Sequence, residues 1–233
     1  MSGCVSTTTT TTQSHLNKMP TRTTNIPEKT IERLSEYRRS LLSCHNQGIT
    51  HIFSHVLAGM HGITAVQVRR DLMLIGFSSD TKKGYEVKTL IEFINSILDS
   101  ENVMNIAIIG MGHLGQAITK YFNGKRRKLR IVTAFDVDPE KVDSVIDDIP
   151  CYHMDQFEEV VSSLDVSIAV ISSPTRVAPS LVVPIINAGI KGVLNFTSAP
   201  LNFPQGIVSE NYDITTILEK VAYFVKEQEE HND

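Results

Sequence analysis

A glycine-rich turn between an apolar run and a helical pattern most limits the folds open to this chain. The run Ile106–Ile109 leads into a G-x-G-x-x-G motif with Gly110, Gly112 and Gly115. These glycines permit a tight turn, a close approach to a pyrophosphate, and close helix packing, respectively. The motif therefore predicts an α/β domain that binds a dinucleotide at a helix N-terminus. The predicted contacts are Gly110, Met111, Gly112, His113, Leu114 and Gly115.

An acidic residue follows at the spacing of a dinucleotide fold. Asp136 ends a second apolar run about twenty-five residues after the glycines. Its carboxylate is placed to accept hydrogen bonds from the adenosine ribose and would repel a 2′-phosphate, so NAD(H) is favoured over NADP(H). Asp138 and Pro139 then have the pattern of an N-cap and a first helical residue, which predicts a helix there.

Composition limits the class of protein. The 233 residues are 41% hydrophobic and 21% charged, as in a globular protein of one large or two small domains. No apolar run approaches the roughly 18 residues that span a bilayer, and no signal-peptide core is present, so we expect a cytoplasmic protein without a membrane partner. The net charge of −4 means that any DNA contact must come from a local basic patch.

The cysteines and histidines predict no metal site. Cys4, Cys44 and Cys151 lie far apart without C-x-x-C spacing, which disfavours a disulfide framework and a thiolate zinc site. His51 and His55 are four residues apart, as helix-borne ligands would be. No carboxylate or third ligand is obvious nearby, so solvated helix histidines are the favoured interpretation.

The segment before the glycine motif has the pattern of a helix-turn-helix. Apolar residues at helical spacing predict a helix from Pro27 to Cys44, and a second short helix is expected over Ile52–Met60. A turn at Gly62 follows. Thr64 and Gln67 then form a capping box, in which each side chain reaches the backbone of the other, and begin a third helix.

Polar side chains on this third helix suit contacts to bases and phosphates. Gln can pair with adenine through two hydrogen bonds, and Arg with guanine or a phosphate. The loop Phe77–Gly84 precedes Tyr85–Val87 and is interpreted as a wing, a hairpin with basic residues at its tip. A solvated basic face is the alternative. The predicted DNA contacts are Thr64, Gln67, Arg69, Arg70, Lys82 and Lys83.

Beyond Asp138, helices and strands are expected to alternate, which predicts a parallel sheet covered on both faces. The expected elements are the strands Ser167–Ile171 and Gly192–Phe196 and the helix Val177–Ala188. Ligands in such sheets lie at the carboxyl ends of the strands. The residues expected to share a crevice with the glycines are Ser172, Ser173, Pro174, Asn195 and Phe196.

These patterns divide the chain into five segments. They are a Thr/Ser-rich leader expected to be disordered (1–25), a winged-helix DNA-binding domain (26–86), an amphipathic linker helix (87–100), a Rossmann-type NAD(H)-binding domain (101–212), and a C-terminal helix with its tail (213–233). The last helix, Ile214–Glu227, carries an apolar stripe that packs either on its own domain or on a partner chain.

Several motifs, in order, resemble those of the Rex family of redox-sensing transcriptional repressors. They are Ile26-Pro27 with Arg33-Leu34 and Tyr37-Arg38-Arg39, then Val66–Leu72, Gly110–Gly115, Phe135–Lys141 and Gly189–Phe196. The resemblance extends from Ile26 to Val225. It implies a homodimer of chains with a winged-helix domain and a Rossmann domain, in which the C-terminal helix is exchanged between subunits.

The resemblance also implies a mechanism. In the family, NADH closes the dimer and moves the recognition helices off a palindromic operator, which we expect here to be A/T-rich. A hydrogen-bond and charge switch accompanies this change, and by motif match its members are Arg39, Tyr121 and Asp213. The residue after Asp213, often aromatic in the family and close to the nicotinamide, is Ile214.

Two other functions stay open. An NAD-dependent oxidoreductase would need a general acid or base beside the nicotinamide, yet the only histidines beyond Asp136 are His153 and His231, and no Lys or His adjoins Ser172 or Asn195. A CoA-binding module on a similar sheet is only mildly disfavoured by Asp136. The favoured hypothesis is a non-enzymatic repressor that senses the NADH/NAD+ ratio through an apolar pocket, which disfavours the NAD+ cation.

Overall fold

The computed structural model describes residues 26–78, 83–122, 124–126 and 128–230. The chain divides into two units, Met1–Asp99 and Ser100–Asp233, and each is described by itself. The predicted leader and Lys82 lie outside the described residues.

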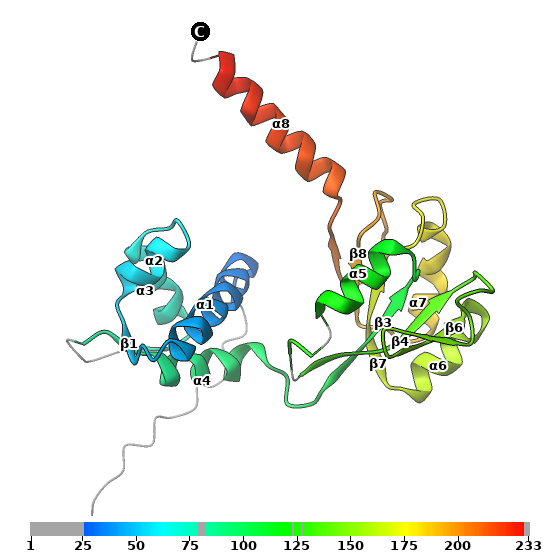
Figure 1. Cartoon of the computed structure of the whole chain (residues 1–233), viewed down its shortest axis with the longest axis horizontal. Helices are drawn as coiled ribbons and strands as arrows, with labels where there is room; N and C mark the ends of the chain where they lie inside the picture. The colour runs from blue at the N-terminus through cyan, green and yellow to red at the C-terminus, as the bar shows by residue number, and fades with distance from the viewer. Residues whose placement is uncertain (1–25, 79–82, 123, 127, 231–233) are drawn as a thin grey trace, which may run out of the picture. The chain divides into compact units, whose positions relative to one another are not determined.

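Unit 1 consists mainly of helices (Figure 1), and these pack around one apolar core. Its elements are α1 (Glu28–Asn46), β1 (His51–Ile52), α2 (Ser54–Met60), α3 (Ala65–Leu74), β2 (Tyr85–Glu86) and α4 (Val87–Leu98). Leu34, Tyr37 and Leu41 recur every three or four residues, so they lie on one face of α1, where all three are fully buried. The same core takes in Leu72 of α3 and Leu90 of α4. Helix α4, predicted as a linker, is therefore part of the core of unit 1.

Two predictions in unit 1 are corrected by the pairing of β1 with β2. His51 pairs with Glu86 and Ile52 with Tyr85, so both residues are extended and the second helix begins at Ser54. Tyr85–Glu86 was expected to close a hairpin with the preceding loop. Its partner is instead the strand before α2, and the described part of the loop, 77–78 and 83–84, contains no strand.

Unit 2 is built on a seven-stranded sheet. In spatial order its strands are β5 (Ser144–Ile146), β6 (Ile149–His153), β4 (Leu129–Asp136), β3 (Met104–Ile109), β7 (Val166–Ile171), β8 (Gly192–Asn195) and β9 (Val208–Asn211). All neighbours pair in parallel except β5 with β6, so the sheet is mixed with an antiparallel edge. Strand β9 was not predicted.

Helices cover both faces of this sheet, as expected. They are α5 (His113–Phe122), α6 (Phe157–Ser163) and α7 (Val182–Asn187), with 3-10 turns η1 (Met154–Gln156) and η2 (Ala178–Leu181) before the latter two. Along β3, Ile108 packs in the cluster that includes Ile118 of α5, whereas Ile109 packs in the opposite cluster with α6 and α7. The helix predicted over 177–188 is divided in the structure into the 3-10 turn η2 and the helix α7, each of which contains a proline.

The helix predicted after Asp138 is wrong. The carbonyl of Asp138 accepts from the backbone nitrogens of Lys141 and Val142, which makes a single turn. Asp143 then has a φ of 56°, a left-handed value that ends the turn. The chain continues as the β5–β6 hairpin, whose connecting residues Asp147 and Asp148 also have positive φ.

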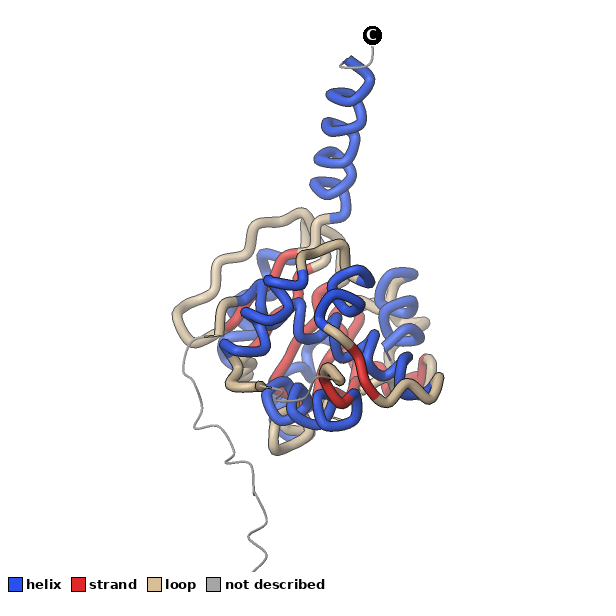
Figure 2. Tube along the Cα trace, turned by 90° about the vertical axis from the view of Figure 1, so that its left-hand side faces the viewer, coloured by secondary structure: helices blue, strands red, loops and turns tan. Residues whose placement is uncertain are grey.

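The last helix, α8 (Ile214–Glu230), has no buried residue among those described. Figure 2 shows it as one uninterrupted helix. Its apolar residues remain exposed; they include Ile217, Leu218, Val221 and Phe224. A stripe of this kind needs a covering surface.

We expect Thr64→Ala to lower the stability of unit 1 by about 1 kcal/mol, because the Thr64 hydroxyl accepts a hydrogen bond from the backbone nitrogen of Gln67 at the start of α3. Hydrogen exchange of α3 amides, followed by mass spectrometry, measures this loss. Thr64→Ser keeps the capping oxygen and serves as the control. Equal protection in all three proteins would contradict the capping role.

Candidate functional site

The glycine motif forms the predicted strand–turn–helix. Strand β3 ends at Ile109 and α5 begins at His113; between them Gly110 has a φ of 99°, which favours glycine. A Cβ added to Gly115 would lie 2.1 Å from the carbonyl oxygen of Gly110, so α5 packs too closely for a side chain. By contrast, no described heavy atom outside its chain neighbours lies within 4 Å of a Cβ on Gly112. That space is where a pyrophosphate would approach.

The end of β7 lies against this turn. The Ser172 hydroxyl donates to the carbonyl oxygen of Gly110 at 2.8 Å, and the Ser172 backbone nitrogen donates to Ile109 at 2.9 Å. The Ser173 hydroxyl oxygen is buried and has no hydrogen-bond partner among the described residues. A buried hydroxyl without a partner is a group that a ligand can satisfy.

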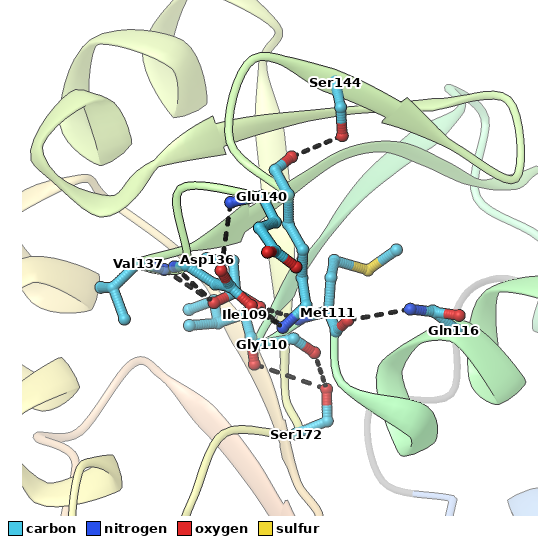
Figure 3. Close-up of polar contacts among 11 residues, drawn as sticks. Ile109, Gly110, Met111, Gln116, Asp136, Val137, Glu140, Ser144 and Ser172 are labelled. Atoms are coloured by element: carbon cyan, nitrogen blue, oxygen red, sulfur yellow. Dashed lines mark hydrogen bonds and ion pairs between the residues drawn. The ribbon is translucent and has the colours of Figure 1, made fainter.

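Asp136 ends β4 beside the glycine turn, with its carboxylate directed at backbone N–H groups (Figure 3). Its Oδ2 accepts from the backbone nitrogen of Met111 at 2.8 Å, and its Oδ1 accepts from Val137 at 2.8 Å and Asp138 at 3.0 Å. Lys141 Nζ lies 3.4 Å from Asp136 and 3.0 Å from Asp138. Its hydrogen bond to Asp138 is the largest cause of the raised pKa of Lys141. The carboxylate is thus ordered at the position predicted for ribose binding.

These elements surround a cavity of about 480 Å³, within the usual range for ligand pockets. Six predicted contacts line it: Gly110, Gly112, Asp136, Ser172, Ser173 and Pro174. Eight further residues complete the wall: Ile109, Phe135, Val137, Lys141, Met154, Arg176, Val177 and Leu181. The wall is therefore largely apolar, with one carboxylate and two cations.

The remaining predicted contacts lie outside the wall of this cavity. Met111 is buried and offers its backbone nitrogen to Asp136, while His113 and Leu114 are exposed in the first turn of α5. Asn195 is fully buried. Its side-chain amide is hydrogen-bonded to Thr197 and Ala199 in the loop after β8 and to Asn211 of β9.

Phe196 stacks on Tyr212, with ring centroids 5.7 Å apart. The ring therefore packs against the residue that follows β9, not against the cavity. Cofactor contacts by Asn195 and Phe196 stay predictions.

Of the three predicted switch residues and the adjoining Ile214, all are exposed except Asp213, which is partly buried. Arg39 is exposed on α1, and Tyr121 of α5 is 67% exposed with Lys125 Nζ 3.1 Å from its ring centroid. Asp213 caps α8 by accepting from the backbone nitrogen of Thr215 at 3.0 Å. Ile214 begins α8 and is 53% exposed. Their common role as a switch stays a prediction.

Among the described residues predicted to contact DNA, Thr64 caps α3, Gln67, Arg69 and Arg70 lie on it, and Lys83 follows it. Arg69 Nη1 donates to the Ser54 hydroxyl at 3.1 Å, which joins α3 to the start of α2. Arg70 and Lys83 are exposed. The capping box is half correct: Thr64 caps Gln67, but the Gln67 side chain does not reach back. Its Nε2 donates to Oδ1 of Asp71 at 2.9 Å instead.

Asp71 is the centre of a buried polar network that the sequence analysis missed. Its carboxylate accepts from Arg33 Nε and Nη2, each at 2.7 Å, and from the Tyr37 hydroxyl at 2.8 Å. Burial raises the pKa of Asp71, but hydrogen bonds from Arg33, Tyr37 and Gln67 outweigh it and hold the pKa below the ordinary 3.8. Burial, and then the bond to Asp71, raise the pKa of Tyr37. The network ties α3 to α1.

No group of three metal-ligating side chains occurs among the residues that the structure describes. His51 lies in β1, so the expected helical spacing of His51 and His55 is wrong; both side chains are exposed. Cys151 of β6 is buried, and burial followed by the charge of Asp136 raises the pKa of its thiol to about 11. Across the described ranges, no helix is both long and apolar enough to cross a bilayer.

Comparison with known proteins bears on both units. A family model described as "CoA binding domain" matches residues 101–199, and one described as "Putative DNA-binding protein N-terminus" matches residues 25–72. The redox-sensing transcriptional repressor Rex of Listeria welshimeri is 35% identical over 89% of this chain and 97% of its own, and that of Exiguobacterium sibiricum 34% over 87% and 93%. The chain belongs to the Rex family.

Solved structures agree with this family assignment. RSP, a Rex-family repressor, was crystallised with β-NAD+ and operator DNA; it is 28% identical, covers 90% of this chain and 96% of its own, and gives a TM-score of 0.82. The same protein with β-NADH gives a TM-score of 0.78. The Rex fold, a DNA-binding N-terminal unit followed by a Rossmann-like sheet, is the fold predicted above.

Sequence reasoning missed two cations in the cavity wall, Lys141 and Arg176. Lys141 could have been found, because it lies three residues after Asp138 and five after Asp136, within reach of both across one turn. Arg176 could also have been found, because it lies two residues after Pro174, in the segment after β7 that was predicted to share the crevice.

We expect Gly112→Ala to fold with stability within about 0.5 kcal/mol of the native chain but to lose most of its affinity for NADH, because the methyl group would occupy the open space at the turn. Gly115→Ala is expected to destabilise unit 2 by about 1–3 kcal/mol or more, since its methyl group overlaps a carbonyl. Thermal unfolding and NADH fluorescence titration separate the two effects. Undiminished NADH binding by Gly112→Ala would contradict the assignment.

We expect Arg33→Met to raise the pH at which α1 and α3 lose protection in acid. The pKa of Asp71 lies below 3.8 when folded, so its stabilising contribution is complete above that value and is lost as the pH falls through the folded-state pKa. Without Arg33, less opposes the effect of burial, so the pKa of Asp71 rises. The stabilising contribution of Asp71 is then lost at a higher pH. Hydrogen exchange across an acid titration measures this, with exposed Arg70→Met as the control. A similar shift in both variants would overturn the prediction.

Proposed function

We propose that this Rex-family chain is a DNA-binding transcriptional repressor that senses the NADH/NAD+ ratio, and that NADH releases it from a palindromic A/T-rich operator. The observation that carries the proposal is the ordered Asp136 carboxylate beside the glycine turn, in the same chain as a capped helix-turn-helix. The first suits an NAD(H) ribose and pyrophosphate, and the second suits the major groove. Such a protein acts in the cytoplasm.

Discrimination between the two cofactors follows from charge. NAD+ carries a positive charge on its nicotinamide ring and NADH does not, so a largely apolar wall disfavours the oxidised form. A coupling of about 1–3 kcal/mol between cofactor and DNA would change operator affinity roughly 5- to 150-fold, and it must act equally in both directions.

A homodimer is part of this proposal. Helix α8 exposes its apolar stripe over its whole described length, with Ile214, Leu218 and Val225 each about half exposed or more. Exchange of this helix between two subunits would cover the stripe. Twofold symmetry in the protein would also match a palindromic operator.

Catalysis is not part of the proposal. The cavity wall contains neither histidine nor cysteine among the described residues, and its carboxylate and Lys141 are engaged with each other. A general acid or base must be able to exchange a proton with the substrate. Turnover of NADH with a small carbonyl compound would restore the oxidoreductase hypothesis.

CoA binding is the second candidate, because the family model that matches residues 101–199 is described as a CoA-binding domain. CoA contains an adenosine whose ribose carries a phosphate, and Lys141 and Arg176 in the wall are cations that could meet it. Displacement of NADH by CoA at similar concentrations would favour this candidate.

The deciding experiment is fluorescence anisotropy of a labelled palindromic A/T-rich duplex with the full-length protein, titrated with NADH and separately with NAD+. We expect NADH to release the duplex and NAD+ to do so much less. Asp136→Ala is the matched control, since it should bind the duplex but ignore NADH. A duplex that binds equally with and without either cofactor would overturn the sensing function, and failure to bind any duplex would overturn the DNA-binding function.

A further inference from the structure

The carboxylate of Asp71 does more than join two helices. It is 2% exposed, and its two oxygens accept hydrogen bonds from Arg33, Tyr37 and Gln67 at 2.7–2.9 Å. Arg33 binds both oxygens through its Nε and Nη2 atoms, a two-point contact that fixes the plane of the carboxylate. The Asp71 carboxylate, which faces Gln67, is therefore held in one orientation.

An ionised carboxylate accepts hydrogen bonds and cannot donate one. The Gln67 amide must therefore turn its Nε2 group toward Asp71, as the distance of 2.9 Å from Nε2 to Oδ1 records. The reverse orientation would place the amide oxygen against a buried negative charge. Asp71 stays ionised at neutral pH, because its hydrogen bonds hold its pKa below the ordinary value.

The second amide atom, Oε1, then lies on the side away from Asp71. Gln67 is half-buried, and its backbone is fixed by the Thr64 cap at the start of α3. The first turn of a recognition helix is the part that meets base edges. The acceptor Oε1 of Gln67 is thus offered there, while one of the two N–H donors of Nε2 is taken up by Asp71.

We propose that Asp71 is a positioning residue that sets the hydrogen-bonding polarity of Gln67, so that Gln67 accepts from the N6 amino group of an adenine in the major groove. Both purines present the acceptor N7 in that groove, but beside it adenine has the N6 amino donor and guanine has the acceptor O6. Of the two purines, an outward oxygen therefore matches adenine and is repelled by guanine. This inference rests on the proposed DNA-binding function and names the base that the site selects.

The test begins with the duplex that the native protein selects from a random-sequence library. Each adenine of that duplex is replaced in turn by purine, which lacks only the N6 amino group. The native protein is expected to lose about fivefold or more in affinity at one adenine of each half-site. Gln67→Ala is expected to bind adenine and purine equally at that position.

Guanine at the same position tests polarity without altering Asp71. The expected order of affinity is adenine, then purine, then guanine, because purine only removes a bond, whereas guanine places the acceptor O6 where adenine has its amino group. The proposal would be overturned if the duplex with guanine bound as tightly as the duplex with purine, or more tightly. It would also be overturned if Gln67→Ala still lost affinity when adenine was replaced by purine.

Variants of the network test the role of Asp71. Asp71→Asn allows the Gln67 amide to turn either way, so it is expected to reduce the preference for adenine over guanine at that one position. Tyr37→Phe removes another donor from the same carboxylate but keeps the charge, and it is expected to retain the preference. A purely structural network predicts that both variants lose affinity for all duplexes alike. If Asp71→Asn fails to fold, the purine and guanine measurements still decide the proposal.

The outcomes separate this inference from the function on which it rests. If no duplex is selected, DNA binding itself fails. If a duplex is selected and NADH releases it, but no adenine amino group matters through Gln67, the repressor function stands and the role of Asp71 is wrong.

Discussion

The closeness of Gly115 to the carbonyl of Gly110 is the constraint on which unit 2 depends. Only a residue without a Cβ lets α5 begin this near to β3. The same turn is bound from the other side by the Ser172 hydroxyl at the end of β7. Three elements therefore meet at one point, and Gly110, Gly112 and the carboxylate of Asp136 line the same cavity because of it.

Local signals explain which features could be predicted. The strand–turn–helix at Gly110–Gly115 and the cap at Thr64 are encoded within a few residues, and both are present. The apolar spacing of α1 and α4 is equally local. The motifs that resemble the Rex family extended these signals from Ile26 to Val225, so the fold class was predictable. The end of each element was less certain, as at Ile52, where a distant strand decides the conformation.

The features that were missed depend on contacts between distant residues. The β5–β6 hairpin replaces an expected helix because three aspartates adopt left-handed φ, a choice that side-chain spacing does not report. Asp71 meets Arg33 across 38 positions in the sequence. Asn195 ends strand β8, where ligand contacts in such sheets are expected, yet its amide is hydrogen-bonded to the loop that follows. In each case the deciding backbone angle or hydrogen bond is not reported by the spacing of apolar and polar residues along the sequence.

The two cysteines that the structure describes, Cys44 and Cys151, are poor targets for a chemical oxidant. The reactive form of cysteine is the thiolate, and Cys151 is buried with its pKa raised to about 11. Cys44, the other cysteine that the structure describes, is also buried. At neutral pH Cys151 is therefore protonated and shielded from peroxide, although its strand β6 pairs with β4, which contributes Asp136 to the cavity wall. A regulator of this kind can respond to the NADH/NAD+ ratio while its thiols at these two positions are protected from direct oxidation.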